Sequence, residues 1–283
     1  MIRIAIQAKG RLNEQSIELL RESGVSVDEN RRKFLTRSES FPLEVLYLRD
    51  DDIPQAVSMG AADLGIVGLN EVAEKGFAVD VVLKLGFGGC RVSLAVPKSV
   101  DYSDPRWFEG RRVATSYPRI LKEYFAREGV TAEIHEIAGS VEIAPAVGMA
   151  DAIFDIVSSG GTLVSNGLVE VEKVLHSEAV LIARPGLEPE KQALLEQLKF
   201  RVGAALESRG MKYLLMNLPT ASVERAIDIL PAMRSPTVMP LAQEGWCSLH
   251  SVVRQEDLWN KIEALKAIGA EGILVLALEK IIK

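Results

Sequence analysis

Short strands and amphipathic helices alternate along most of this chain. Ile2, Ile4 and Ile6 recur at every second position, as in a half-buried strand, and a helical pattern follows them. Further strands are predicted at residues 43–48 and 90–97, each separated from the next by helical segments. Such an alternation favours an α/β architecture, and we expect its sheets to be largely parallel.

Composition and charge limit the class of protein. The 283 residues are 48% apolar and 25% charged, which is typical of a soluble globular chain of two or three domains. No apolar run reaches the roughly 18 residues that cross a bilayer, and the N-terminus does not resemble a signal peptide. We therefore expect a cytoplasmic protein that does not enter a membrane. The net charge of -6 argues against nucleic-acid binding, and Cys90 and Cys247 are interpreted as reduced thiols.

A weak internal repeat is present. Residues 60–67, "GAADLGIV", resemble residues 148–155, "GMADAIFD". Each segment is interpreted as a helix end, a turn that contains an aspartate, and then a buried strand. Two similar α/β lobes would produce this pattern, although a match this short also arises by chance.

The last seventy residues follow a different order. The elements expected there are a strand, a helix, two strands, a helix and a strand, at residues 212–218, 222–230, 237–241, 246–253, 257–268 and 272–277. This β-α-β-β-α-β order is that of the ferredoxin-like unit. Such a unit folds alone and often senses small ligands, although a fold does not establish a function.

One segment carries the signature of an anion-binding loop. In "DIVSSGGTLVSNGL", residues 155–168, an apolar strand contains Asp155 and opens into the small residues Ser158–Thr162. Backbone N–H groups in such a turn can all point at one phosphate, and a following helix adds its dipole. A carboxylate just before the turn is placed to accept hydrogen bonds from sugar hydroxyls, so the pair predicts a ribose 5-phosphate. The alternative is a plain strand-to-helix turn with Asp155 at the surface.

Other common motifs are missing. The chain has no P-loop signature, and "GFGGC" at residues 86–90 lacks the third glycine of a dinucleotide-binding loop. His135-Glu136 has no second histidine at the spacing of a zinc protease. The three histidines are interpreted as surface or structural residues.

Several ordered blocks together resemble one enzyme family. They are "IAIQAKGRL" (4–12), "LRDDDIP" (48–54), "DLGIVG" (63–68), "FGGCRVSLAVP" (87–97), "RVATSYP" (112–118), "GSVEIAP" (139–145), "DIVSSGGTLVSNGL" (155–168) and "SPTVMPLA" (235–242). From end to end the chain is similar to the long form of ATP phosphoribosyltransferase, the first enzyme of histidine biosynthesis. The C-terminal unit distinguishes the long form from the short form, which relies on a separate partner protein.

The resemblance implies a fold class and a division into domains. It implies an α/β protein with a two-lobed catalytic core like that of periplasmic binding proteins, followed by an ACT-like regulatory domain. We expect residues 1–92 with 179–211 to form the first lobe and residues 93–178 to form the second lobe, with the phosphate loop. Residues 212–283 are expected to form the regulatory domain.

The resemblance also implies a reaction and its residues. The family joins N1 of the ATP adenine to C1 of phosphoribosyl pyrophosphate (PRPP), with Mg²⁺ as cofactor, and releases pyrophosphate. Expected catalytic residues are Lys9, Arg11, Glu142 and Asp155; PRPP-binding residues are Asp155, Val157, Ser158, Ser159, Gly160, Gly161 and Thr162; ATP-binding residues are Arg11, Asp51 and Tyr117. For Asp51, the alternative role of a helix N-cap is equally well supported. No metal ligands are assigned, because the substrates are expected to carry most of the Mg²⁺.

Regulation and assembly are expectations of the same kind. Free histidine is the expected inhibitor, and Asn217, Thr237 and Gly272 are its expected contacts, converging across a subunit interface. The family suggests a homo-oligomer, a dimer or hexamer, with no separate regulatory subunit. Three other classes stay open at this point: an exported solute-binding protein, a salvage phosphoribosyltransferase, and a pure amino-acid sensor.

Overall fold

The chain divides inside one long helix. The computed structural model describes residues 1–27, 34–230 and 236–282. Two units, Met1–Gln197 and Leu198–Lys283, meet within α6 (Pro189–Ser208). The run of basic residues Arg31-Arg32-Lys33 in the sequence lies outside the described residues.

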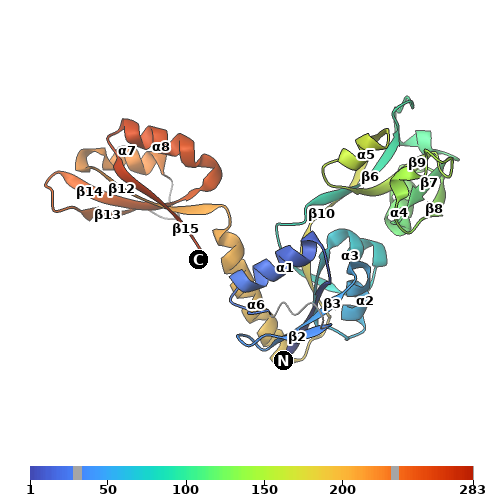
Figure 1. Ribbon diagram of the computed structural model, residues 1–283, viewed down its shortest axis with the longest axis horizontal. Coiled ribbons are helices and arrows are strands. Elements are labelled where there is room, and N and C mark those ends of the chain that lie inside the picture. The colour runs from blue at the N-terminus through green and yellow to red at the C-terminus, as the bar shows by residue number, and fades with distance from the viewer. Residues whose placement is uncertain (28–33, 231–235, 283) are drawn as a thin grey trace. The chain divides into compact units, whose positions relative to one another are not determined.

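Two sheets make up the first unit (Figure 1). The first sheet has the order β2-β3-β1-β4-β11-β5, with bounds Leu35–Arg37, Leu43–Leu48, Ile2–Gln7, Leu64–Gly68, Ala179–Ala183 and Asp80–Lys84. The helices α1 (Arg11–Glu22) and α2 (Ile53–Ser58) lie on opposite faces of it. Opposite faces follow from right-handed crossovers, because the chain moves to one side from β1 to β3 and back again to β4. We call this sheet and its helices lobe I.

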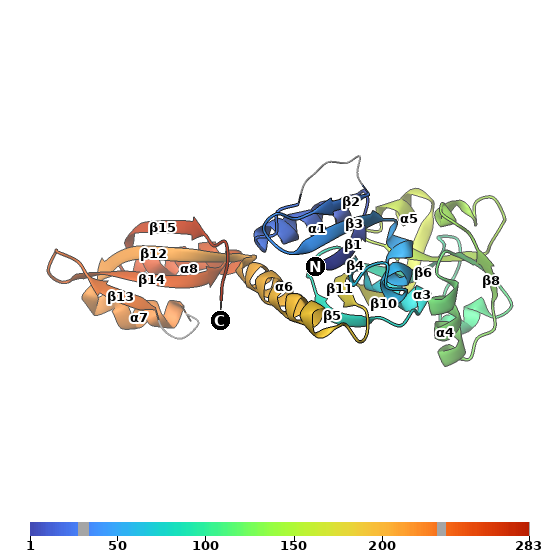
Figure 2. The same ribbon diagram turned by 90° about the horizontal axis from the view of Figure 1, so that it is seen from below.

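The second sheet forms lobe II. Its order is β10-β6-β9-β7-β8, with bounds Leu168–Ser177, Cys90–Pro97, Ala152–Val157, Arg112–Thr115 and Glu133–Glu136. The view in Figure 2 shows this lobe with α4 (Pro118–Glu128) and α5 (Gly161–Ser165). The first sheet ends at Lys84 and the second begins at Cys90, two residues before the predicted lobe boundary; the domain assignment itself stays a prediction.

The expectation of largely parallel sheets is wrong. Parallel pairing of neighbouring strands is confined to β3-β1-β4 in lobe I and β8-β7-β9 in lobe II. β6 runs antiparallel to β9 and β10, and β11 runs antiparallel to β4 and β5. The reason is the chain path: it leaves lobe I after β5 and returns only with β11, so the connecting strands enter each sheet in the opposite direction.

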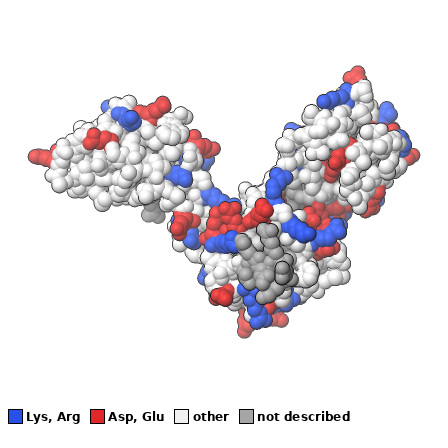
Figure 3. Space-filling view, in the orientation of Figure 1, with Lys and Arg blue, Asp and Glu red and all other residues white. Residues whose placement is uncertain are grey.

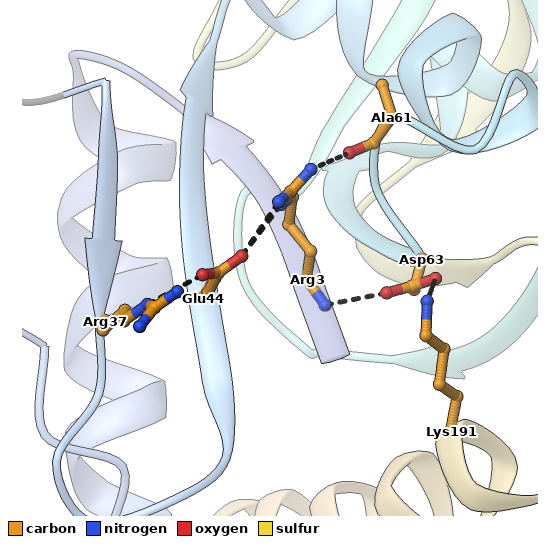
Figure 4. Close-up of polar contacts among 6 residues, drawn as sticks. All are labelled: Arg3, Arg37, Glu44, Ala61, Asp63 and Lys191. Carbon is orange, nitrogen blue, oxygen red and sulfur yellow. Dashed lines mark hydrogen bonds and ion pairs between the residues drawn. The ribbon is translucent and has the colours of Figure 1, made fainter. Parts of the chain in front are cut away.

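The repeat seen in the sequence corresponds to the same pattern of hydrogen bonds in both lobes. Just before β4, Asp63 accepts a hydrogen bond from the backbone N–H of Arg3 on β1 (2.9 Å), and the Arg3 guanidinium donates to the Ala61 carbonyl (Figure 4). Just before β9, Asp151 accepts from the backbone N–H of Arg112 on β7 (3.0 Å), whose guanidinium donates to Gly148 and to Asp151 itself. Each aspartate therefore ties together the starts of two neighbouring parallel strands.

In lobe I the aspartate belongs to a wider charge network. Asp63 is almost fully buried and also accepts from Lys191 of α6 at 2.8 Å. Arg3 in turn pairs with Glu44, which Arg37 also contacts (Figure 4). The two guanidinium groups hold the pKa of Glu44 below its usual value. This network lies at the amino ends of the parallel strands, so it does not occupy their carboxyl ends.

The second unit confirms the predicted ferredoxin-like topology. Its sheet order is β13-β14-β12-β15, all antiparallel, with bounds Thr237–Pro240, Trp246–Arg254, Met211–Pro219 and Glu271–Ala277. The helices α7 (Val223–Ile229) and α8 (Leu258–Ala267) lie on one face of this sheet (Figure 1). Leu214, Met216 and Leu218 of β12 point toward them and are fully buried. The predicted fold class, two α/β lobes followed by a ferredoxin-like unit, is therefore confirmed.

Two further expectations concern the thiols and membranes. Both cysteines are free: Cys90 is half-buried and Cys247 is buried. Within the described ranges, the structure has no helix with the length and apolar character needed to span a bilayer. On the face drawn in Figure 3, acidic and basic side chains occur in small mixed groups.

Candidate active site

Loops from both lobes gather at the carboxyl ends of the parallel strands. In lobe I, β1 leads to Lys9 and Arg11, β3 leads to Asp51, and β4 leads to α3 (Leu69–Lys75). In lobe II, β7 leads to Tyr117, while β8 and β9 lead to the segments that hold Glu142 and residues 155–162. Ligands of open α/β sheets bind at this edge, because the loops there converge and the helices begin there.

The predicted phosphate loop leaves β9 with free backbone donors. Gly160 adopts a left-handed conformation, φ 81°, which strains any residue with a side chain. Within the described residues, no acceptor is found for the N–H groups of Ser159, Gly160 and Thr162. The helix α5 that follows has only five residues, Gly161–Ser165, so its dipole is weaker than the sequence suggested. The local N–H groups are therefore the main feature that would attract an anion.

A brace that the sequence analysis missed supports this loop. The guanidinium of Arg91, on β6, donates to the carbonyl of Ser158 at 3.0 Å and makes two hydrogen bonds to the carboxylate of Glu170, on β10. Ser93 donates to the same carboxylate at 2.7 Å. A two-pronged Arg–carboxylate pair fixes both groups in one plane, so Glu170 holds the Arg91 guanidinium in place. Arg91 in turn holds the Ser158 carbonyl, at the start of the loop.

Asp155 lies half-buried at the end of β9, not at the surface. Burial is the main cause that raises the pKa of Asp155 to about 6, and the negative charge of nearby Glu142 raises it further. A hydrogen bond from the backbone N–H of Ile156, at 2.8 Å, opposes the rise. A carboxylate that is costly to ionise without a partner is suited to receive donors from a ligand.

Glu142 stands in a loop with an unusual backbone. Ser140, two residues earlier, has φ 52° and is the sole non-glycine residue with positive φ in the part of the chain that the structure describes. Val141, between them, is buried and anchors the turn. A strained conformation of this kind is kept where packing forces it, and it is common at functional sites.

Tyr117 joins the two lobes. Its hydroxyl donates to Glu71, in α3 of lobe I, at 2.8 Å, and accepts from Asn70 at 3.2 Å. Burial, together with the charges of Glu71 and Asp155, raises the pKa of the Tyr117 hydroxyl, so it stays protonated. The charges of Asp50 and Asp51 contribute, after burial, to the raised pKa of Glu71. The structure therefore brings Asp51, Tyr117, Asp155 and Glu142 into one electrostatic neighbourhood.

The remaining predicted residues of lobe I have fewer constraints. Lys9 and Arg11 are exposed on either side of Gly10, whose left-handed φ of 93° turns the chain into α1. Asp51 pairs with Arg49 at 3.2 Å and makes no side-chain capping bond to the helix that follows, so the N-cap alternative receives no support.

Oxygen ligands for a metal ion are present in the described part of the chain, but they form no complete metal centre there. Among the residues that the structure describes, no three His, Cys, Asp or Glu side chains form a group able to hold a metal ion. The carboxylates of Glu142 and Asp155 are of the type that Mg²⁺ prefers, and they are close enough to affect one another. Two such groups fit an ion that arrives with most of its ligands supplied by substrate phosphates.

In the second unit, two of the three predicted histidine contacts are neighbours. Asn217, on β12, lies opposite Glu271, and a side chain added at Gly272 would meet the Asn217 amide at 3.4 Å. Thr237 lies on β13 and pairs with His250 of β14, so one full strand separates it from β12. Within one chain, Thr237 is therefore set apart from Asn217 and Gly272, and the convergence of the three across a subunit interface stays a prediction.

Comparison with known proteins identifies the family. The family model of ATP phosphoribosyltransferase (HisG) matches residues 49–204, and the model of the HisG C-terminal domain matches residues 208–280. Proteins named ATP phosphoribosyltransferase from Phocaeicola vulgatus and Bacteroides thetaiotaomicron are 55% and 54% identical, over all of both chains. An ATP phosphoribosyl transferase (HisG:HisZ) complex from Thermotoga maritima contains a chain with a TM-score of 0.60 and 26% identity, and the match covers 72% of this chain and 99% of that one. The chain belongs to the ATP phosphoribosyltransferase family, and its C-terminal domain makes it a long-form member.

Proposed function

We propose that this chain transfers the 5-phosphoribosyl group of PRPP to N1 of the adenine of ATP, as the first step of histidine biosynthesis. A bond forms between N1 and C1 of the ribose, and the bond between C1 and the pyrophosphate oxygen breaks. The electron pair of the broken bond leaves with pyrophosphate. The observation that carries this proposal is the half-buried Asp155 beside a loop of free backbone donors, in a chain of this family.

PRPP is assigned to lobe II. The segment Val157–Thr162 would surround the 5-phosphate with its N–H groups. Arg91 would hold this segment through its hydrogen bond to the Ser158 carbonyl. Asp155 would accept hydrogen bonds from the ribose hydroxyls, in addition to the one that it accepts from the backbone N–H of Ile156 in the free protein. Glu142, close enough to raise the pKa of Asp155, would lie beside the same ribose.

ATP is assigned to residues of both lobes. Arg11 and Asp51 come from lobe I and Tyr117 from lobe II. Adenine N1 already has a lone pair, so the step needs no general base, and the protein chiefly positions two anionic substrates. Lys9 and Arg11 are exposed cations at the carboxyl end of β1, where they would stabilise the charge of the departing pyrophosphate.

Mg²⁺ is the proposed cofactor. Bound to PRPP, it would neutralise part of the charge that builds up on pyrophosphate. Glu142 and Asp155 are the residues whose oxygen atoms fit it best, since the local charge there is negative and the ligands are carboxylates.

Histidine is the proposed inhibitor, bound by the ferredoxin-like unit. Asn217, Thr237 and Gly272 would supply polar contacts, with the chains of a dimer or hexamer completing the site. Because the regulatory unit is part of the chain, no separate regulatory subunit is needed. We place the enzyme in the cytoplasm, where ATP and PRPP are made.

Pyrophosphate release tests the proposal. The purified chain, with Mg²⁺ and PRPP, should release pyrophosphate when ATP is the acceptor and not when guanine or hypoxanthine is. Activity with the free bases would instead indicate a salvage enzyme. Release with none of the acceptors would leave a binding protein or a sensor.

A further inference from the structure

The helix α4 of lobe II has no cap of its own. Its N-cap residue is Tyr117, whose side chain makes no capping hydrogen bond. Pro118 has no N–H, and the N–H of Leu121 already donates to the Tyr117 carbonyl. The N–H groups of Arg119 and Ile120 are the two first-turn donors that remain, and such donors need an acceptor.

Both donors are accepted by one side chain of the other lobe. Glu74, in α3 of lobe I, takes the N–H of Arg119 on one carboxylate oxygen at 2.9 Å. It takes the N–H of Ile120 on the other oxygen at 3.0 Å. A carboxylate at this position also interacts favourably with the positive end of α4. Lobe I therefore supplies the cap that lobe II lacks.

One turn earlier on α3, Glu71 holds the side chain of Tyr117. Residues three apart lie on the same face of a helix, so Glu71 and Glu74 act on α4 together. Asn70 donates to both the Glu71 carboxylate (3.0 Å) and the Tyr117 hydroxyl (3.2 Å). The hydroxyl of Ser177, on β10, donates to Asn70 at 2.7 Å. The side chains of this network are all buried, at 4–7% exposure, and are therefore shielded from competing water: Asn70, Glu71, Tyr117 and Ser177.

We propose that Glu71 and Glu74 are positioning residues that align lobe II with lobe I through α4 and fix the Tyr117 ring for ATP. The inference rests on the proposed function, in which ATP is bound by residues of both lobes and the phosphoribosyl part of PRPP by residues of lobe II. Loss of the alignment should therefore weaken ATP use and spare PRPP binding. A residue that only stabilised the fold would affect both substrates.

Steady-state kinetics and amide exchange on the full-length enzyme test this. For Glu74→Ala we expect the KM for ATP to rise about tenfold, equivalent to about 1.4 kcal/mol. The Kd for PRPP from calorimetry should stay within about twofold of wild type, because the residues assigned to its phosphoribosyl part all lie in lobe II. Hydrogen exchange at Arg119 and Ile120 should become faster, because both N–H groups lose their acceptor.

Conservative variants separate hydrogen bonding from charge. Glu71→Gln keeps an oxygen for the Tyr117 hydroxyl and should retain a KM for ATP near that of wild type, whereas Glu71→Leu should raise it. Glu123→Ala is the matched control: Glu123 is an acid on α4 that pairs with Arg119 at 3.1 Å in an exposed position and lies in lobe II. It should leave both kinetic constants and the exchange rates unchanged.

Two results would overturn the proposal. One is an equal rise in the ATP and PRPP constants of Glu74→Ala; the other is unchanged exchange at Arg119 and Ile120 in that variant. The exchange measurement does not depend on turnover. A wild-type enzyme that releases no pyrophosphate would therefore refute the proposed function, while the exchange rates would still decide whether Glu74 caps α4.

Discussion

Burial makes ionisation of the Asp155 carboxyl unfavourable in the free protein. Its pKa is raised to about 6, mainly by burial, so between the unfolded and folded pKa values the folded state holds a proton that the unfolded state has lost. Folding stability from this group is therefore complete below the unfolded pKa and is lost as the pH rises from that value to about 6. At neutral pH the loss amounts to as much as about 3 kcal/mol, taking about 1.4 kcal/mol for each pKa unit.

Asp155→Asn should consequently stabilise the fold and impair the enzyme. Urea unfolding at about pH 8 should show a larger free energy of unfolding for the variant, and the gain should shrink as the pH falls toward 5. Its kcat/KM for PRPP should drop sharply, because hydrogen bonds to a charged acceptor contribute roughly 1.5–3 kcal/mol each. A variant that is less stable at every pH would mean that Asp155 serves the fold.

At the scale of the element, the phosphate loop offers a clean steric test. Gly161 has no positive φ, and an added Cβ would make only ordinary contact with Ser159 at 3.6 Å, so Gly161→Val should fold normally. Its side chain would stand where backbone must approach phosphate, and we expect PRPP saturation to be lost in kinetic assays. Gly160→Ala is the companion variant, since its left-handed backbone should cost about 1 kcal/mol of stability. Wild-type PRPP kinetics in Gly161→Val would contradict the assignment.

Elements were easier to predict than the contacts between them. Strands at 43–48 and 90–97 match β3 and β6 to the residue, because their apolar patterns are local. The antiparallel direction of β6 was not predictable in this way, since it depends on partners 58 to 87 residues away in the sequence.

The same distinction holds for the site. Asp155 and its loop form one continuous motif, and the sequence alone was enough to single them out. Arg91 acts on Ser158 across 67 residues, and Glu71 and Glu74 act on Tyr117 and Arg119 across about 45. Nothing in the residues around them distinguishes these three side chains from ordinary surface charges, so only the folded chain reveals them.

At the scale of the whole molecule, the central question is whether histidine bound to the second unit inhibits the reaction in the first. Thr237 is exposed on β13, so Thr237→Ala should leave the fold and the uninhibited turnover unchanged, within about 0.5 kcal/mol of stability. The histidine concentration for half-inhibition should rise, because inhibition requires tighter binding to one conformation than to another. Met239→Ala, two residues along the same exposed strand, is the control. Unchanged inhibition in Thr237→Ala, or no histidine binding by calorimetry, would remove Thr237 from the site.

The insertion of β11 between β4 and β5 has a consequence for synthesis on the ribosome. β5 ends at Lys84, yet its partner in the sheet is β11, which begins at Ala179. At about 5–20 residues per second, the nascent chain carries β5 without its partner for roughly 5–20 s. Lobe II, in contrast, is one continuous stretch and has all its strands by Ser177. The lobe that is translated second is therefore the first that can be completed, and the earlier lobe must wait, with β4 open to chaperones or to aggregation, until the chain returns to close it.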